Sequence, residues 1–407
     1  MKRKLTTNSR LVNELFANYV STFTAFCELI NNSLQAGAKN ISIDIDYTPD
    51  SELHPLIIKK IKIKDDGTGV HVDDITKTIL EIGTASKDGG KGIGRFAAFQ
   101  IGQQITINTI GFSQESKSYS KVEIPLSAEM FGKNLNVTEV DIDTNEELLD
   151  GKHTTYYEVQ VDNLYTSVVT DSEPRKKIID KFLEANIRDA IFERYPLKIF
   201  NKEVVFNING NPIDPKNFII GDPEKKIKTY TDKKGDDHKV FFNHIHIKGM
   251  DRIKVFLTTN NAGIETIATG FEYDAIWLSP KIGGWFVYVQ SDTLPADMYR
   301  NIDLDGMDEN IKQYRSFIKE ELNNFFKEKN KEFDNFTEKL KGDDYYPYKE
   351  SSSSQSKVLL FDKLAYLVED KYHILNNQDR LREIIYPLID RTIANGELDK
   401  ILRGILS

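Results

Sequence analysis

A long amphipathic helical pattern, followed at once by strand patterns, constrains the fold of this chain more than any other feature. Across residues 11–35 apolar side chains recur at helical spacing, and Gly37 follows as a helix stop signal. Residues 41–47 (ISIDIDY) and 57–64 then alternate apolar and polar side chains, as half-buried strands do. The apolar stripe of the helix needs a covered face, so the sequence predicts a helix packed against a sheet.

Further strand patterns extend this predicted sheet. They cover residues 105–110, 121–125 and 154–161, and a second helical stretch follows at 175–194. A sheet with helices on one side is an α/β (α+β) sandwich, and we assign residues 1–195 to such a domain.

The chain has 407 residues, more than one hydrophobic core usually serves, so we expect at least one further domain. The segment KIFNKEVVFNINGNPI, which begins at Lys198, predicts a strand, a turn at Asn209 and Gly210, and another strand. More strand patterns follow at 240–247, 253–258 and 285–290, and residues 307–340 then predict one or more long, highly charged helices. We assign residues 196–342 to a mixed α/β domain.

The end of the chain has a different character. Residues 343–357 include a polar, serine-rich stretch that indicates a linker. Residues 358–407 carry helical patterns, and the chain stops on an apolar one without a clear cap. We expect a helical segment here that is truncated from a longer protein.

Composition narrows the classes of function. The formal net charge of −9 argues against general, non-specific binding to nucleic acid, which is itself polyanionic. The single cysteine, Cys27, cannot form an intrachain disulfide, which fits a reducing, cytoplasmic location. No run approaches the roughly 18 apolar residues of a membrane span. The basic N-terminus lacks the apolar region of a signal peptide, so we expect no membrane partner.

The first of three candidate motifs is ELINNSLQAGA, residues 28–38. Glu28 and Asn32 lie four residues apart on the predicted helix, hence on one face. A carboxylate there can orient or deprotonate an attacking water, and an amide oxygen one turn later can ligate Mg²⁺. Taken alone, the pair fits an amphipathic helix with one polar stripe equally well.

The second motif, IKIKDDGTGV, spans residues 61–70. A strand pattern delivers an aspartate into a Gly-x-Gly turn. A buried carboxylate can accept a hydrogen bond from the adenine amine, and the small Gly67 and Gly69 would let the ring approach the backbone. Taken alone, the Asp-Gly pair indicates a plain β-turn.

The third motif, GTASKDGGKGIGRFAAFQIG, spans residues 83–102. Clustered glycines precede a helical pattern, and the backbone amides of such a loop can hold phosphates. The Gly-Lys pair lacks the Ser/Thr and the spacing of a Walker A loop, and a first strand does not precede it as in a Rossmann motif. A flexible loop is the alternative for this run alone.

In this order the motifs together resemble the GHKL superfamily, which includes MutL, type II topoisomerases, HtpG-type heat-shock chaperones, MORC proteins and sensor histidine kinases. ELINNSLQAGA is similar to the MutL form of the N-box, DDGTGV to the adenine-binding motif, and IGTASK with GGKGIGRFAAF to the ATP lid. The similarity covers residues 26–102 and is closest in style to the MutL, MORC and HtpG groups. It implies a Bergerat-fold ATP-binding domain.

The resemblance also implies roles for individual residues. Glu28 would be the general base, Asn32 the Mg²⁺ ligand, and Asp65, rather than Asp66, the adenine acceptor, with Gly69 against the ring. The remaining cofactor contacts implied for the ATP lid and the turn are Gly67, Thr84, Lys87, Gly90, Lys91, Gly92, Ile93, Gly94 and Arg95.

The sequence departs from the family pattern at two places. Gln35 stands where many relatives carry an acid. HTTYYEVQV resembles the family strand whose Gly-Thr pair helps to bind adenine, but His153 replaces the glycine, and Thr154 is the residue we assign to adenine.

Family members that hydrolyse ATP usually carry a transducer domain after the ATP-binding domain, and residues 196–342 occupy that place. A transducer supplies a basic residue to the γ-phosphate, for which Lys281 and Arg300 are the candidates. The resemblance therefore implies a switch ATPase that binds Mg·ATP, hydrolyses it slowly, closes its lid and forms a homodimer.

Two other classes of function stay open. One is a nucleotide-regulated binding module without useful hydrolysis, and the other is a histidine-kinase-type phosphotransferase. Only 27 residues precede the N-box here, which leaves no room for a dimerising phosphoacceptor bundle. The resemblance favours DNA as a partner, whereas the net negative charge of the chain disfavours DNA binding. The choice between DNA and a protein client therefore stays open.

Overall fold

The chain divides into two compact units in a computed structural model. The first comprises Met1–Ile213 and Asn261–Thr266, and the second Asp214–Asn260 and Ile267–Ser407. The structure describes residues 2–4, 6–7, 22–47, 58–82, 94–132, 141–164, 181–250, 252–261, 264–275, 280–281, 283–291, 293, 309–349, 354–375 and 378–394. No helix among them is long and apolar enough to cross a membrane.

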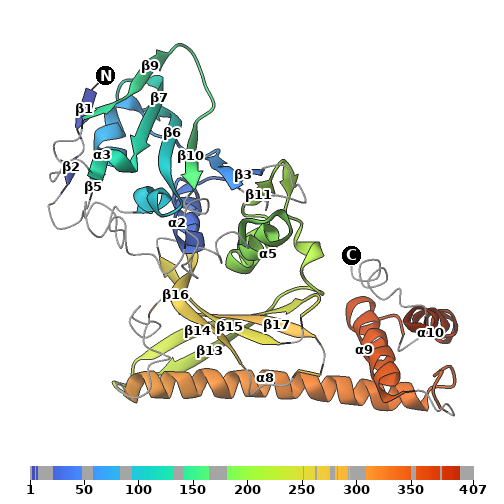
Figure 1. Cartoon of the computed structure of the whole chain (residues 1–407). Helices are drawn as coiled ribbons and strands as arrows, with labels where there is room; N and C mark the ends of the chain where they lie inside the picture. Colours follow the sequence, from blue (N-terminus) through green and yellow to red (C-terminus); the bar gives the residue numbers. More distant parts are fainter. Residues whose placement is uncertain are drawn as a thin grey trace. The chain divides into compact units, whose positions relative to one another are not determined.

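The first unit is built on an eight-stranded sheet (Figure 1). In spatial order its strands are β12 (Asn211–Pro212), β11 (Val205–Ile208), β3 (Asn40–Tyr47), β4 (Ile58–Asp65), β10 (Tyr156–Leu164), β6 (Gly102–Ser113), β7 (Ser118–Ser127) and β9 (Asn145–Leu149). Only the β11–β3 pair of this sheet is parallel. Two short pairs accompany it: β1 (Lys2–Lys4) with β8 (Asp141–Asp143), and β2 (Thr6–Thr7) with β5 (Glu81–Ile82).

Helices complete this unit and confirm the predicted sandwich. They are α2 (Thr22–Gln35), η1 (Val72–Asp74), η2 (Thr76–Leu80), η3 (Gly94–Gln100), α3 (Ala128–Gly132), α5 (Glu184–Arg194) and α6 (Pro196–Phe200). The apolar face of α2 is buried with the inward side chains of β3 and β4, as the alternating patterns predicted. Gly37, at φ +75°, ends α2, and its N–H donates to Leu34 O over 3.1 Å. The predicted start of this helix, residues 11–21, lies outside the described residues.

The first unit continues past the boundary that we placed after residue 195. β11 adds to the sheet in parallel with β3, and Asn209 Oδ1 accepts a hydrogen bond from Ile45 N over 2.8 Å. Asn209 and Gly210 both have positive φ, as a tight hairpin turn between β11 and β12 requires. The start of the predicted strand, KIF, instead lies in α6.

The second unit has a five-stranded sheet with one long helix packed across a face (Figure 1). Its strands, in spatial order, are β13 (Glu224–Thr231), β14 (Asp237–Ile247), β17 (Gly284–Gln290), β15 (Ile253–Asn261) and β16 (Ile264–Asp274). The helix is α8 (Glu309–Gly342), and η6 (Pro215–Asn217) is a short turn ahead of β13. Tyr314, Ile318 and Leu322 of α8 are fully buried against the sheet.

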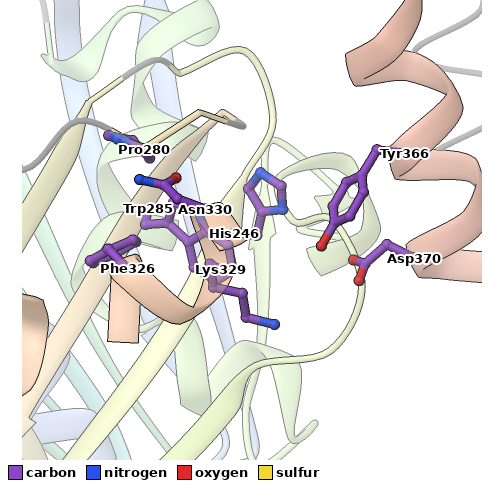
Figure 2. A pocket seen from close by; sticks show the side chains of 8 residues that line it. All are labelled: His246, Pro280, Trp285, Phe326, Lys329, Asn330, Tyr366 and Asp370. Atoms are coloured by element: carbon purple, nitrogen blue, oxygen red, sulfur yellow. The ribbon is translucent and has the colours of Figure 1, made fainter. Parts of the chain in front are cut away.

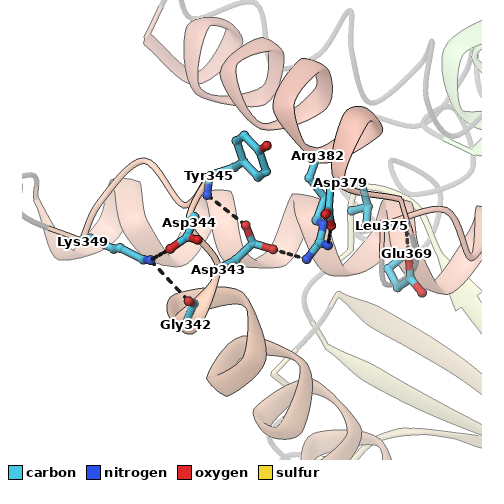
Figure 3. A network of polar contacts seen from close by, with 9 residues as sticks. All are labelled: Gly342, Asp343, Asp344, Tyr345, Lys349, Glu369, Leu375, Asp379 and Arg382. Atoms are coloured by element: carbon cyan, nitrogen blue, oxygen red, sulfur yellow. Dashed lines mark hydrogen bonds and ion pairs between the residues drawn. The ribbon is translucent and has the colours of Figure 1, made fainter.

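The segment that we predicted as a linker is packed in its described part. The turn after α8 leads to α9 (Gln355–Tyr372) and α10 (Asp379–Ala394), and these helices share a core with the end of α8. Asp343 joins the turn to α10 by an ion pair with Arg382, and it accepts a hydrogen bond from Tyr345 N over 2.9 Å (Figure 3). Tyr346 is buried and donates to Asp362 over 2.8 Å.

Two histidines are buried side by side on β14. His244 stacks on Phe325 at 3.6 Å, and His246 stacks on Trp285 at 4.4 Å between ring centroids. His246 also lines a small cavity with Lys329 of α8 and with residues of α9 (Figure 2). Neither Nε2 has a hydrogen-bond partner among the described residues. Burial lowers the pKa of His244 to about 3 and that of His246 to about 4, so both rings are neutral at pH 7.

We predict that the second unit loses stability as the pH falls from about 6.5 towards 4. In that window the histidines bind protons in the unfolded state but stay neutral in the folded state. The free energy of unfolding therefore falls by about 1.4 kcal/mol per pH unit for each ring. Urea unfolding at pH 7 and pH 5, followed by tryptophan fluorescence, measures the loss. His246→Gln should flatten this dependence, and an unchanged pH dependence in that variant would contradict the assignment.

Candidate functional site

Asp65 ends β4 on the buried face of the sheet. Ile61, Ile63 and Asp65 alternate inward along the strand, so the carboxylate follows two core side chains. Asp65 is only 3% exposed. Its Oδ2 accepts a hydrogen bond from Ser33 Oγ over 2.6 Å, and its Oδ1 accepts from Gly67 N over 2.9 Å. Burial raises the pKa of Asp65, and these hydrogen bonds oppose that shift.

Asp66 points the other way and has a structural role. Its Oδ1 accepts hydrogen bonds from Lys39 N and Asn40 N over 2.7 and 2.8 Å, and its Oδ2 accepts from Asn40 Nδ2 over 2.6 Å. Desolvation pulls the pKa of Asp66 upward, but the hydrogen bonds outweigh it and lower the pKa. Asp66 therefore clamps the start of β3, and Asp65 is the aspartate that faces inward beside α2.

Helix α2, which carries most of the first motif, packs next to Asp65 of the second motif. Ser33, which our sequence reading did not single out, donates the hydrogen bond that ties this helix to Asp65. Glu28 and Asn32 are half-buried on the same helix, one turn apart. Ser33 lies on the buried face together with Phe26 and Ile30. A polar residue on that face needs a partner, and this is the signal that could have identified it.

The glycines after Asp65 are required by the backbone itself. Gly69 has φ +61°, and a Cβ there would lie 2.0 Å from Ile110 O. A Cβ at Gly67 would lie 2.9 Å from the Cβ and O of Ala36 and from Asp65 Oδ1. The turn can pack against α2 and β6 only because both positions lack a side chain.

Thr155, rather than Thr154, faces this turn. Tyr157 pairs with Asp65 across β10 and β4, and Thr155 lies two residues earlier on the same face. The Thr155 hydroxyl donates to Gly67 O over 2.7 Å, whereas Thr154 is exposed. The strand therefore presents a threonine next to the turn, one residue after the position we assigned.

The environment of Glu28 suits a proton acceptor. Burial raises the pKa of Glu28 above its ordinary 4.5, and the charge of Arg194 and a hydrogen bond from Asn31 oppose the shift. A carboxylate with a raised pKa holds a proton more readily than an exposed glutamate does, which is the property a general base needs near neutral pH.

A magnesium ion is compatible with the donor set around α2. No group of three or more His, Cys, Asp or Glu side chains that could hold a metal occurs in the described part of the chain. Mg²⁺ usually takes only one or two protein ligands and completes its shell with water and phosphate oxygens. Asn32 alone could supply such a ligand if a nucleotide supplied the phosphates.

Several predicted contacts fall outside the described residues. For the lid these are Thr84, Lys87, Gly90, Lys91, Gly92 and Ile93, and in the second unit it is Arg300. Gly94 and Arg95 begin η3, where only the backbone is described. Lys281 is described: its Nζ lies 2.5 and 2.6 Å from the two carboxylate oxygens of Asp334 on α8. Within its own unit this lysine is therefore engaged in an ion pair.

Known proteins are similar to part of this chain. Three DNA mismatch repair proteins MutL from clostridia match it in part. The protein of Clostridium perfringens is 30% identical over 194 residues, 45% of this chain and 24% of that protein. The protein of Clostridium tetani is 26% identical over 201 residues, 46% of this chain and 27% of that protein. The protein of Clostridium botulinum is 25% identical over 284 residues, 59% of this chain and 38% of that protein.

The chain thus spans between a quarter and two fifths of the length of these relatives. The family described as histidine kinase-, DNA gyrase B- and HSP90-like ATPases matches residues 19–155, which contain α2, the Asp65 turn and Thr155. This stretch is therefore similar to the ATP-binding domain of that family, as the three motifs predicted.

Proposed function

We propose that this protein is a conformational switch driven by ATP: the first unit binds Mg·ATP, hydrolyses it slowly, closes its lid over the phosphates and pairs with the same unit of a second copy. The observation that carries the proposal is the buried carboxylate of Asp65. It lies at the end of a strand, before a turn whose two glycines add no side chain of their own beside it, and next to a helix that carries Glu28 and Asn32.

The hydrogen bonds of Asp65 leave room for adenine. A carboxylate can accept about four hydrogen bonds. Ser33 Oγ, Gly67 N and the backbone of Tyr157 supply three of them. The remaining lone pair can accept from the exocyclic amine of adenine, a donor that guanine lacks at that position. The same geometry therefore favours ATP over GTP.

Glu28 and Asn32 would have separate roles at the phosphates. When bound, Mg²⁺ neutralises charge on the phosphate oxygens. Asn32 would hold that ion, and Glu28 would accept the proton of the attacking water. Lys281 or Arg300 of the second unit would supply the positive charge at the γ-phosphate, and Lys281 would have to leave Asp334 to do so. Because lid closure and pairing precede hydrolysis in this scheme, turnover should be slow.

Two alternatives remain distinguishable by experiment. A binding module would bind ATP without turning it over. A kinase would transfer labelled phosphate to a protein histidine. Whether the switch acts on DNA, as the name of the similar mismatch repair proteins suggests, or on a protein client is a separate question.

We predict that Asp65→Asn weakens ATP binding at least about fivefold. The amide can present its own donor to the adenine amine, and a buried mismatch of this kind costs about 1–3 kcal/mol. Isothermal titration calorimetry with Mg·ATP measures the loss. Asp66→Asn is the matched control, since it removes the same charge from the neighbouring, exposed side chain and should leave ATP affinity near that of the parent. Equal affinities in Asp65→Asn and the parent would refute the adenine contact.

We predict that Glu28→Ala binds Mg·ATP about as well as the parent but hydrolyses it at least about 100-fold more slowly. In the parent, turnover should fall as the pH drops through the raised pKa of Glu28, because the protonated carboxyl cannot accept a proton. Phosphate release and calorimetry provide the two measurements. Size-exclusion chromatography with ATP should show the variant as a persistent dimer. Retained turnover in Glu28→Ala would exclude this residue as the base.

Asn32→Ala should behave differently from Glu28→Ala. Because it removes a proposed ligand of Mg²⁺, we predict that ATP affinity and turnover fall together, and that raising the Mg²⁺ concentration restores part of both. A variant with parental affinity at low Mg²⁺ would contradict the metal assignment. ATP binding without any turnover in the parent would favour the binding-module or kinase alternative.

A further inference from the structure

We propose that Ser33 is a specificity-determining residue: its hydroxyl holds the Asp65 carboxyl in the ionised state, and this state selects the adenine amine over the guanine carbonyl. The inference rests on the proposed function, because it concerns the carboxylate that would bind adenine. It deepens that function by naming the group that controls the proton at Asp65. The three motifs assign no role to Ser33.

The Ser33 and Asp65 side chains meet in the interior of the first unit. Ser33 is 4% exposed and Asp65 is 3% exposed. The Ser33 hydroxyl donates to Asp65 Oδ2 over 2.6 Å, within the range of about 2.5–2.7 Å for a hydroxyl that donates to an ionised oxygen. Gly67 N donates to Oδ1 over 2.9 Å. Each carboxyl oxygen thus accepts from a donor of the protein, which is the arrangement of an ionised group.

The Ser33 hydroxyl has two acceptors within reach. Its Oγ also lies 3.4 Å from Leu29 O, one turn earlier on α2. When Asp65 is ionised, the single proton of the Ser33 hydroxyl makes the shorter contact, with Asp65. When Asp65 is protonated, its own O–H can donate to Ser33 Oγ, and the Ser33 hydroxyl can donate to Leu29 O instead. Protonation of Asp65 therefore exchanges a short, charge-assisted hydrogen bond for a longer one to the backbone.

The other surroundings of Asp65 include groups that favour the protonated form. Burial raises the pKa of Asp65 most, and the hydrogen bond from Ser33 is the largest effect in the opposite direction. The hydrogen bond from Gly67 N also lowers this pKa, the charge of the adjacent Asp66 raises it, and the backbone of Tyr157 on β10 lowers it. Without the Ser33 hydroxyl, Asp65 would therefore bind a proton at higher pH.

The proton at Asp65 decides which base fits. An ionised carboxyl only accepts hydrogen bonds, so it pairs with the exocyclic amine of adenine. A protonated carboxyl presents a donor, which suits the carbonyl oxygen that guanine carries at the same ring position. A buried donor opposite the adenine amine is a mismatch that weakens binding. By holding Asp65 ionised, Ser33 would extend the preference for ATP over GTP to lower pH.

The test measures the affinities for Mg·ATP and Mg·GTP by calorimetry between pH 5.5 and 8, in the full chain. In the parent, ATP affinity should fall at low pH as Asp65 binds a proton. Ser33→Ala should move this acid limb to higher pH by about one pH unit, the effect of one lost hydrogen bond to a charged group. On that limb the ratio of ATP to GTP affinity should fall about tenfold, whereas at pH 8 ATP affinity should stay within about threefold of the parent. Ser33→Thr keeps a hydroxyl and should restore both.

Ser120→Ala is the matched control. Ser120 is a buried serine of the same unit, and its hydroxyl oxygen accepts from Val72 N over 2.8 Å. The same substitution there should leave the acid limb and the ATP-to-GTP ratio unchanged. Burial also raises the pKa of Glu28 on α2, so binding rather than turnover is measured, and the series is repeated in the Glu28→Ala background. Protonation of the nucleotide phosphates is common to all variants and cancels in the comparison.

The outcomes separate this inference from the proposed function. If the parent binds ATP but Ser33→Ala keeps the parental acid limb and the parental ATP-to-GTP ratio, the role of Ser33 is overturned and the proposed function stands. An equal loss of ATP and GTP affinity at every pH also overturns it, because a displaced helix would give that result. If the parent binds neither nucleotide, both proposals fail.

Thermal melting at each pH checks that the variants are folded. Where Ser33→Ala is not folded at the assay temperature, Ser33→Cys, whose thiol is a weaker donor, takes its place. We then expect the same direction of change, and a parental acid limb in Ser33→Cys would contradict the inference.

Discussion

The hydrogen bond between Ser33 and Asp65 is the interaction on which the arrangement of the first unit depends. It joins the last turn of α2 to the end of β4, and it does so in the interior, where an unpaired carboxylate would be costly. Because Glu28 and Asn32 lie on the same helix, this single contact also sets their distance from the turn that would receive adenine. In the proposed function, adenine binding and the chemistry at the phosphates would therefore both depend on the position of this helix.

The contacts that support α2 extend beyond residues 19–155, the stretch that matches the ATPase family. β11 pairs with β3, and Phe206 on β11 supports the ring of Tyr195, whose hydroxyl reaches α2. The sheet edge formed by residues after 195 is thus part of the same compact unit as the motifs. A domain defined by the motifs alone would lack Tyr195, which contacts α2, and Phe206, which packs against Tyr195.

The local pattern of the sequence predicted which way several side chains of the candidate site face. Alternation along β4 places Asp65 inward behind Ile61 and Ile63, and this agrees with the choice of Asp65 over Asp66. The same alternation, counted back from the buried Val159 and Val161, would have selected Thr155; our assignment of Thr154 followed a motif alignment instead. Helix α8 and most strands of the second sheet were also predicted from periodicity.

Contacts between distant segments carried no such signal. The parallel pairing of β11 with β3, the approach of Tyr195 to Asn31, and the ion pair of Lys281 with Asp334 join residues that no periodicity relates. Strand β13 was not predicted for another reason. It is a lysine-rich edge strand whose first six residues are all at least partly exposed. Apolar and polar residues therefore do not alternate along it.

The pairing of β3 with β11 has a consequence during synthesis. The hydrogen bond from Ile45 to Asn209 spans 164 residues of sequence. At about 5–20 residues per second, a ribosome needs on the order of ten seconds or more to make the intervening chain. Throughout that interval β3 is a hydrophobic edge strand without its neighbour, the kind of edge that pairs with other chains. Until residues 205–208 are made, this edge of β3 is therefore open to pairing with other chains.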